Sequence, residues 1–440
     1  MPFGADSPRV TVTPPGPVSR ALAARLRAVE SPNITPLEDT IVWTEAAGAN
    51  VRDADGNVYV DLTAGFAVAA AGHARPEVAA AVGRQAARLP HGLGDVHPSE
   101  AKIRLLERLA ELAPGDLSVS VLASAGAEAV EAALKTALVA TGRPGVLAFD
   151  GAYHGLTYGA LAVTSRDLFR APFRAQLYPG VRFAPYPRAP GDLAGALDAA
   201  GRAMDEAAPT GAPIGAVLVE PVQGRGGLIR PPPGFLAGLR ELCDARAAVL
   251  IFDEIYTGFG RTGRWFACQY EGVVPDIMTV GKALTGMLPL SAAIGTPAVM
   301  GTWPTSGGEA IHTSTFLGNP LACAAALAQL DVIEAEGLVG RAADLGATLE
   351  RRLRDWASRE PRIAELRGLG LMQGVRLGGT TPDAAGAASR TVAGALREGV
   401  LLLPEGPAGD VLALTPPLVV TEAQLLEAVT VVERALAAVS

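Results

Sequence analysis

Two polar residues, Asp253 and Lys282, follow short apolar runs that predict buried strands. Asp253 ends the run VLIFD, and Lys282 comes one glycine after the run DIMTV. Ligands of open α/β sheets bind outside the carboxyl ends of the strands, so we expect both side chains to face one site. A carboxylate for a ring nitrogen and an amine that forms an imine are the groups that a pyridine aldehyde cofactor requires. Taken alone, an acid at a strand end is more often a cap or a loop residue.

Lysine is scarce in this chain, which narrows the choice of reactive amine. Of the 37 basic residues, only Lys102, Lys135 and Lys282 are lysines. Lysine can offer a neutral amine that condenses with an aldehyde, whereas arginine cannot. Lys102 and Lys135 fall in predicted helices, where we expect surface or structural roles. Lys282 is therefore the candidate nucleophile.

Two segments have residue types that suit a phosphate group. Ser124, Gly126 and Ala127 lie in a turn of small residues between a predicted strand and a predicted helix, whose N-terminus offers amide groups and a dipole. The hydroxyl cluster 313–315 (TST) is the second, with a helix cap as the alternative. Tyr153 follows another strand end, where it could stack on a planar ring or be an ordinary half-buried tyrosine.

The order of predicted elements indicates an α/β fold. Helices alternate with apolar strands from about residue 75, which predicts a large domain at 66–318 with a mostly parallel sheet flanked by helices. We expect the N-terminal segment 1–65 and the C-terminal segment 319–440 to form a smaller α+β domain. In the first of these, a turn at Asp55-Gly56-Asn57 predicts a hairpin between strands at 41–43 and 58–62. The other predicted elements are strands at 119–123, 145–149, 216–220, 248–253, 371–377 and 411–414, and helices at 76–89, 99–112, 128–139, 233–245, from 319 onward and at 422–439.

Composition excludes several classes of function. The net charge of -8 and the absence of basic runs argue against nucleic-acid binding. No apolar stretch is long enough for a membrane span, and the first residues do not resemble a signal peptide. Three widely spaced cysteines predict reduced thiols in a cytoplasmic protein, and five histidines without ligand spacing predict no metal site.

Seven segments together resemble the class III (ornithine/ω-amino-acid type) aminotransferases, which have fold type I of the pyridoxal-phosphate (PLP) enzymes. The resemblance covers nearly the whole chain from about Val51. Its segments are 55–73, 124–137, 153–155 (YHG), 219–224 (VEPVQG), 252–263 (FDEIYTGFGRTG), 276–284 (DIMTVGKAL) and 315–323 (TFLGNPLAC). It implies an enzyme that moves an amino group between an amine donor and a keto acid or aldehyde acceptor by a ping-pong mechanism.

The resemblance also implies roles for single residues. Lys282 matches the lysine that holds PLP as a Schiff base, and Asp253 matches the partner of its ring nitrogen. Thr315 matches a hydroxyl that reaches the phosphate in the neighbouring subunit, which implies a homodimer with shared sites. The other implied cofactor contacts are Gly126 and Ala127 at the phosphate, Tyr153 stacked on the ring, and Ser124, His154, Glu220 and Tyr256; the implied substrate contacts are Phe66, Arg225 and Ser314.

Departures from the family pattern concern the substrate. Tyr256 replaces a glutamine, and its hydroxyl could still reach the cofactor. Leu156 replaces an arginine that two branches carry. A family pair of glutamate and arginine, which binds the α-carboxylate of glutamate, is replaced here by Arg225 and Ala413. Our hypothesis is that Arg225 itself binds a substrate carboxylate, with a solvent-facing side chain as the alternative. The missing arginine favours a terminal (ω) amine as donor.

Two other functions compete with the aminotransferase. A PLP-dependent racemase or epimerase of the same family needs a second acid–base group opposite Lys282, and Arg225 is a poor base. A non-enzymatic relative has no reason to keep both Lys282 and Asp253. We therefore predict that this protein is an aminotransferase.

Overall fold

A seven-stranded sheet forms the centre of the larger part of the molecule. In the computed structural model, which describes residues 3–33, 40–207 and 211–439, the strand order is β4-β10-β9-β8-β7-β5-β6. All its strands are parallel except β10, which is antiparallel to both neighbours. The strands span Val119–Ala123 (β4), Ser291–Gly295 (β10), Ile277–Val280 (β9), Val249–Asp253 (β8), Ile214–Val219 (β7), Gly145–Phe149 (β5) and Val181–Ala184 (β6).

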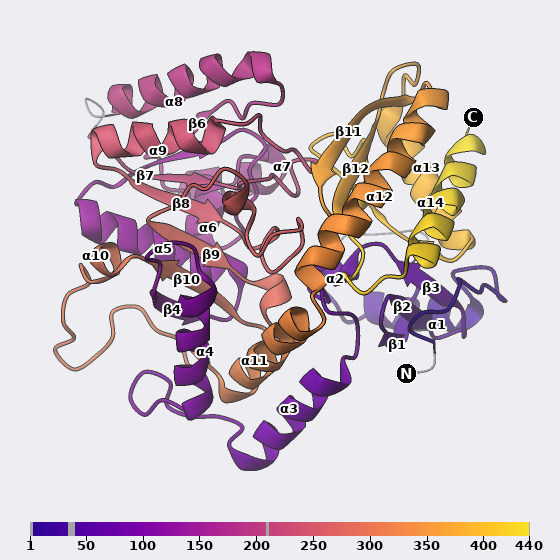
Figure 1. Cartoon of the computed structure of the whole chain (residues 1–440), viewed down its shortest axis with the longest axis horizontal. Coiled ribbons are helices and arrows are strands. Elements are labelled where there is room, and N and C mark those ends of the chain that lie inside the picture. The colour runs from indigo at the N-terminus through magenta and orange to yellow at the C-terminus, as the bar shows by residue number, and fades with distance from the viewer. Residues whose placement is uncertain (1–2, 34–39, 208–210, 440) are drawn as a thin grey trace.

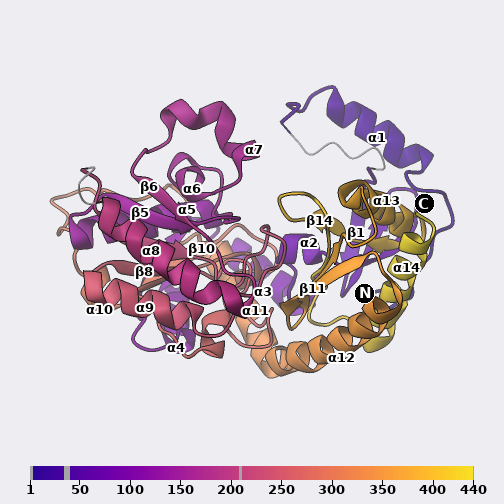
Figure 2. The same ribbon diagram turned by 90° about the horizontal axis from the view of Figure 1, so that it is seen from above.

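Helices cover both faces of this sheet, as the alternating pattern predicts. Successive side chains of a strand point to opposite faces, so Ile251 packs with the cluster that includes helix α5 (Gly126–Thr141), whereas Leu250 and Phe252 pack with the cluster that includes α9 (Phe235–Arg246). In Figure 2, α6 (Tyr158–Val163) lies on the opposite side of the sheet from α9. The strands are buried on both faces and carry uninterrupted apolar runs for that reason.

Two smaller sheets come from the two ends of the chain. The first has the order β1-β2-β3-β13 and the second β11-β12-β15-β14. Parallel pairing of Val400 with Val60 joins the C-terminal segment to the N-terminal one. Figure 1 shows both sheets beside the large one. The short helix α2 (Ala64–Ala67) lies between the large part of the molecule and these two sheets. The strands are Trp43–Ala47 (β1), Asn50–Asp53 (β2), Val58–Asp61 (β3), Val400–Leu401 (β13), Ile363–Leu369 (β11), Met372–Leu377 (β12), Val411–Leu414 (β15) and Leu403–Glu405 (β14).

The predicted elements agree with the structure except at the first hairpin. The turn at Asp55-Gly56-Asn57 joins β3 to β2, so the predicted strand partner at 41–43 was wrong. β1 begins only at Trp43 and pairs with the other edge of β2. The sequence NVRD of β2 contains one apolar residue, which is why it gave no strand signal. The domain limits at residues 65 and 318 stay a prediction.

The remaining helices complete both parts of the molecule. Among the described residues, no helix is long and apolar enough to cross a membrane. Cys243, Cys268 and Cys323 are buried and unpaired. The helices are α1 (Pro17–Arg27), α3 (Pro76–Arg88), α4 (Glu100–Leu112), α7 (Asp167–Arg170), α8 (Leu193–Ala207), α10 (Pro297–Met300), α11 (Pro320–Ala335), α12 (Leu338–Arg359), α13 (Ala384–Arg397), α14 (Glu422–Ala437) and the 3-10 turns η1 (Ala171–Gln176), η2 (Pro190–Asp192), η4 (Ala267–Tyr270) and η5 (Lys282–Leu284).

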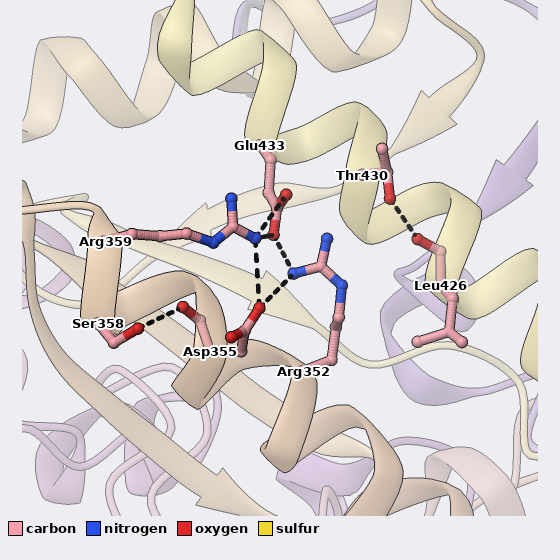
Figure 3. Close-up of polar contacts among 7 residues, drawn as sticks. All are labelled: Arg352, Asp355, Ser358, Arg359, Leu426, Thr430 and Glu433. Atoms are coloured by element: carbon pink, nitrogen blue, oxygen red, sulfur yellow. Dashed lines mark hydrogen bonds and ion pairs between the residues drawn. The ribbon is translucent and has the colours of Figure 1, made fainter.

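A cluster of charged residues forms ion pairs between α12 and α14 (Figure 3). Glu433 of α14 pairs with Arg352 and with Arg359 of α12, the latter at 3.4 Å. The side chain of Glu433 is only 12% exposed, so its two cations balance a largely desolvated carboxylate.

Replacing Glu433 with glutamine is expected to lower the free energy of unfolding by about 1–2 kcal/mol, because Arg352 loses the nearer of its two carboxylates in a half-buried place and keeps only Asp355 at 4.0 Å. The matched control is Glu350→Gln, which breaks an exposed pair with Arg354 of the same helix and should cost less than about 0.5 kcal/mol. Thermal denaturation of both variants measures the difference. Equal shifts would contradict the role given to Glu433.

Candidate active site

The carboxyl ends of β8 and β9 bring Asp253 and Lys282 into one cavity. The two strands are parallel neighbours, with Asp253 opposite Thr279, and Lys282 follows β9 after Gly281. The cavity has a volume of about 290 Å³. It is lined by Gly126, Ala127, Tyr153, His154, Gly155, Leu156, Glu220, Arg225, Asp253, Ile255, Tyr256 and Lys282.

Lys282 has a strained backbone and a desolvated amine. Its φ of 43° lies in the left-handed region, which a side chain other than glycine rarely adopts and which is common at functional sites. Its Nζ lies 4.1 Å from the centroid of the Tyr256 ring. Burial lowers the pKa of the amine, and the negative charge of Asp253 partly opposes this. The neutral form needed for attack on a carbonyl is therefore more accessible than for a lysine in water.

Asp253 is held in one orientation by three donors. The Nδ1 atom of His154 lies 2.7 Å from Oδ2, while the Ile255 amide and the Thr279 hydroxyl donate to Oδ1 at 3.1 and 3.3 Å. The imidazole of His154 is buried, and its Nε2 has no partner among the described residues. These contacts hold the carboxylate in one orientation at the wall of the cavity.

Glu220 organises the backbone on the other side of the cavity. Its carboxylate accepts hydrogen bonds from the amides of Tyr153 at 3.0 Å and Gly224 at 2.9 Å. Burial raises the pKa of Glu220 to about 7, against the opposing effect of His154. Glu220 therefore fixes the position of Tyr153 and of the loop that carries Arg225.

The turn before α5 has the features of a phosphate site. The amides of Gly126 and Ala127 at this helix N-terminus make no hydrogen bond with the described part of the chain. A Cβ at Gly126 would lie 2.9 Å from Ile255, so a side chain would fill the cradle. The amide of Ser124 instead donates to Glu128 at 2.8 Å, and Ser124 does not line the cavity. Free amides, a carboxylate, an amine and an aromatic ring in one cavity fit a phosphorylated pyridine aldehyde.

Besides Ser124, three predicted residues lie outside the cavity of this chain. Phe66, Ser314 and Thr315 are exposed, Phe66 by 61%. Thr315 was predicted to contact the phosphate in a neighbouring subunit, so its position in a single chain does not test that prediction. The roles of Phe66 and Ser314 stay predictions as well.

Sequence reasoning missed two charged residues beside the cavity. Glu405 at the end of β14 is buried, and its Oε2 lies 3.6 Å from Nε of Arg225. Arg166 lies near both of them. The single acid after the apolar run VLLLP was a signal for Glu405, whereas nothing in the sequence around Arg166 distinguishes it from a surface arginine.

Comparison with known proteins gives the family. The model of "Aminotransferase class-III" matches residues 33–436. The chain is a class III aminotransferase. Enzymes of this family depend on PLP, and so does this one. The site geometry described above fits that cofactor.

Relatives of this aminotransferase cover nearly its full length. A 4-aminobutyrate aminotransferase of Mycobacterium tuberculosis is 38% identical, with 97% of each chain covered. An alanine/serine racemase of Pyrococcus horikoshii is 34% identical, over 98% of this chain and 93% of the relative. A solved structure of the ornithine aminotransferase from Toxoplasma gondii superposes with a TM-score of 0.85 at 33% identity, over 96% of this chain and 94% of that one.

Glu220→Gln is expected to change how the stability of the cofactor-free protein depends on pH. The pKa of Glu220 is raised from 4.5 to about 7 on folding, so its contribution to stability is complete below about pH 4.5 and is lost as the pH rises through 7. Relative to the variant, the wild type should lose up to about 3 kcal/mol between these limits. Urea denaturation of both proteins across this range measures it. Curves that stay parallel would contradict the raised pKa.

Proposed function

We propose that Lys282 is the amine that carries PLP and moves the proton in an aminotransferase acting on a terminal amine. The observation that supports this most is the pairing of β8 with β9, which sets the Lys282 amine and the Asp253 carboxylate in one cavity. Bound PLP supplies an electron sink for the carbon that loses its proton. The remaining steps fall to side chains of this chain.

Each residue around the cavity has one task in this proposal. Asp253, oriented by His154, keeps a proton on the ring nitrogen. Lys282, freed by the incoming amine, would take a proton from the donor carbon and deliver it to the cofactor carbon two bonds away, across the nitrogen that joins them. Tyr153 covers the ring, and Glu220 holds Tyr153 in place. The amides of Gly126 and Ala127 bind the phosphate. Ser124 and, from a second subunit, Thr315 are further phosphate contacts in this proposal.

The proposed donor is an ω-amino acid or a related amine with a primary amino group at its end. The names of two relatives, 4-aminobutyrate and ornithine aminotransferase, support a substrate of this kind. Two positions where the family pattern has arginines are apolar here: Leu156, which is half-exposed at the cavity, and Ala413, which is buried. The acceptor in this proposal is a keto acid or an aldehyde.

We also propose that two copies of the chain share their sites. Apolar side chains are exposed on two adjoining segments: Leu93 (59%) and Val96 (64%) on one, Ile311 (67%) and Phe316 (60%) on the other. The segments contact each other through the Phe316 ring, 5.2 Å from that of His91. Exposed apolar groups next to the predicted intersubunit residue Thr315 suit a dimer interface. The cytoplasmic location stays a prediction.

Lys282→Ala is expected to abolish the visible absorption band of the lysine-bound cofactor, because no other described residue brings an amine to the cavity lining. The control Lys135→Ala should keep it, since Lys135 contacts His312 outside the cavity. Asp253→Asn should keep the band and lower turnover by about 100-fold or more, because the ring nitrogen loses its proton. Spectra and single-turnover rates of the purified variants measure both effects. If the Lys282→Ala variant keeps the absorption band of the lysine-bound cofactor, the proposal is wrong.

A panel of donors tests the substrate class. We expect ω-amino acids and terminal diamines to bleach the band of the wild type, with formation of pyridoxamine phosphate, faster than α-amino acids do. Absorption followed after single additions of each donor gives the order. Bleaching by α-amino acids alone would contradict a terminal-amine donor.

The second candidate is an amino-acid racemase. The racemase among the relatives and the buried acid Glu405 beside the cavity both favour it. Racemisation needs an acid–base group on each face of the α-carbon, and Glu405 would have to be the second. Exchange of the substrate α-proton with deuterium while the band persists would select this function over transamination.

A further inference from the structure

Three charged residues from distant segments lie close together beside the cavity that contains Lys282. Arg166 precedes α7, Arg225 lies in the loop after β7, and Glu405 ends β14. The side chain of Glu405 is 7% exposed and that of Arg225 is 36% exposed. We refer to these three residues as the rim cluster.

The pair of Arg225 and Glu405 is incomplete. Nε of Arg225 lies 3.6 Å from the carboxylate, which is too long for a hydrogen bond, and it has no other partner in the described part of the chain. The guanidinium also lies 4.9 Å from the centroid of the Tyr153 ring, so it faces the cofactor side of the cavity. Burial raises the pKa of Glu405, while Arg225, Lys282 and Arg166 act against that rise. Among the described residues, the ion-pair partner of Glu405 is thus Arg225, at a distance that leaves the contact loose.

Arg166 adds a second positive charge beside the same carboxylate of Glu405. Within residues 3–33, 40–207 and 211–439 its side chain forms no ion pair and no hydrogen bond. Its Cζ lies 5.2 Å from the centroid of the Phe169 ring, and that of Arg225 lies 5.9 Å from the same centroid. Burial and the charge of Arg225 both lower the pKa of Arg166. Two guanidiniums and one carboxylate leave one positive charge in a half-buried place.

An anion that completes this charge set must come from outside the chain. Besides Lys282, the only arginine or lysine that lines the cavity among the described residues is Arg225, and the lining residue Leu156 is apolar. Guanidinium groups bind carboxylates with planar, often bidentate geometry. The rim cluster is therefore where a substrate carboxylate finds its charge partners.

We propose that Arg166 and Arg225 together bind the carboxylate at the far end of the substrate, and that Glu405 is the internal counterion with which this carboxylate competes for Arg225. The inference rests on the proposed function, because it places that carboxylate relative to Lys282. It assigns a specificity role to Arg166 and Glu405, two residues that act on substrate binding and take no part in the proton transfers. Competition by Glu405 also keeps the cavity open to amines without a carboxylate.

Binding of butanoate and of butanamide to the PLP-loaded enzyme, followed through the visible band of the bound cofactor, tests this. These ligands match in size, differ in charge and have no amino group that could react. Wild type should bind butanoate more tightly than butanamide. Arg166→Gln should weaken butanoate binding by about 10-fold or more and leave butanamide unchanged. Glu405→Gln should strengthen butanoate binding several-fold, because its competitor is gone.

Arg174→Gln is the matched control, because Arg174 lies in the next turn of the same segment, 65% exposed and paired with Asp167. It should leave both ligands unaffected. The proposal is overturned if Arg166→Gln weakens both ligands alike, if Glu405→Gln weakens butanoate, or if wild type does not prefer the carboxylate. A normal band in all these variants shows that the site is intact, so such a result would leave the role of Lys282 standing. Failure of the proposed function would instead appear as a band that survives in Lys282→Ala.

Discussion

Parallel pairing of β8 with β9 determines where Asp253 and Lys282, the two groups that we propose for the chemistry, lie. With Asp253 opposite Thr279, the next residues of both strands leave the sheet at the same edge. A shift of one residue would turn Asp253 from the site to the other face of the sheet. The helices on both faces hold this register by burying every residue of both strands. The rest of the site is arranged around these two strand ends.

The chief difficulty of such a site is the burial of many charges in a small volume. Asp253, Glu220 and Glu405 stand near Lys282 and Arg225. Burial raises the pKa values of Glu220 and Glu405 and lowers that of Lys282, while attraction between opposite charges works in the other direction. Backbone amides satisfy Glu220, and His154 and Thr279 satisfy Asp253. The rim cluster is the part in which this balance is left incomplete, which fits a place for the substrate.

The sequence predicts the features of this chain that depend on local pattern. Strands β4 and β5 begin and end where the apolar runs do, and Asn319 caps α11 with its side chain, as its position before the long helix suggests. The strand β2 was not predicted because its four residues, NVRD, are too few to show the alternation of apolar and polar residues that indicates a strand. The positions of Arg166 and Glu405 beside the cavity were not predicted, because their proximity depends on how segments 239 residues apart pack. The local sequence around either residue does not indicate this packing. The motif residues around Lys282 were predictable because each lies at a strand end or a helix start.

The most direct test of the central claim is to find which lysine holds the cofactor. Borohydride reduction of the holoenzyme makes the bond between PLP and the lysine permanent, and mass spectrometry of the digested protein then locates it among Lys102, Lys135 and Lys282. We expect the mass of the reduced cofactor on Lys282 alone. The same label on Lys102 or Lys135, or on no lysine, would contradict it.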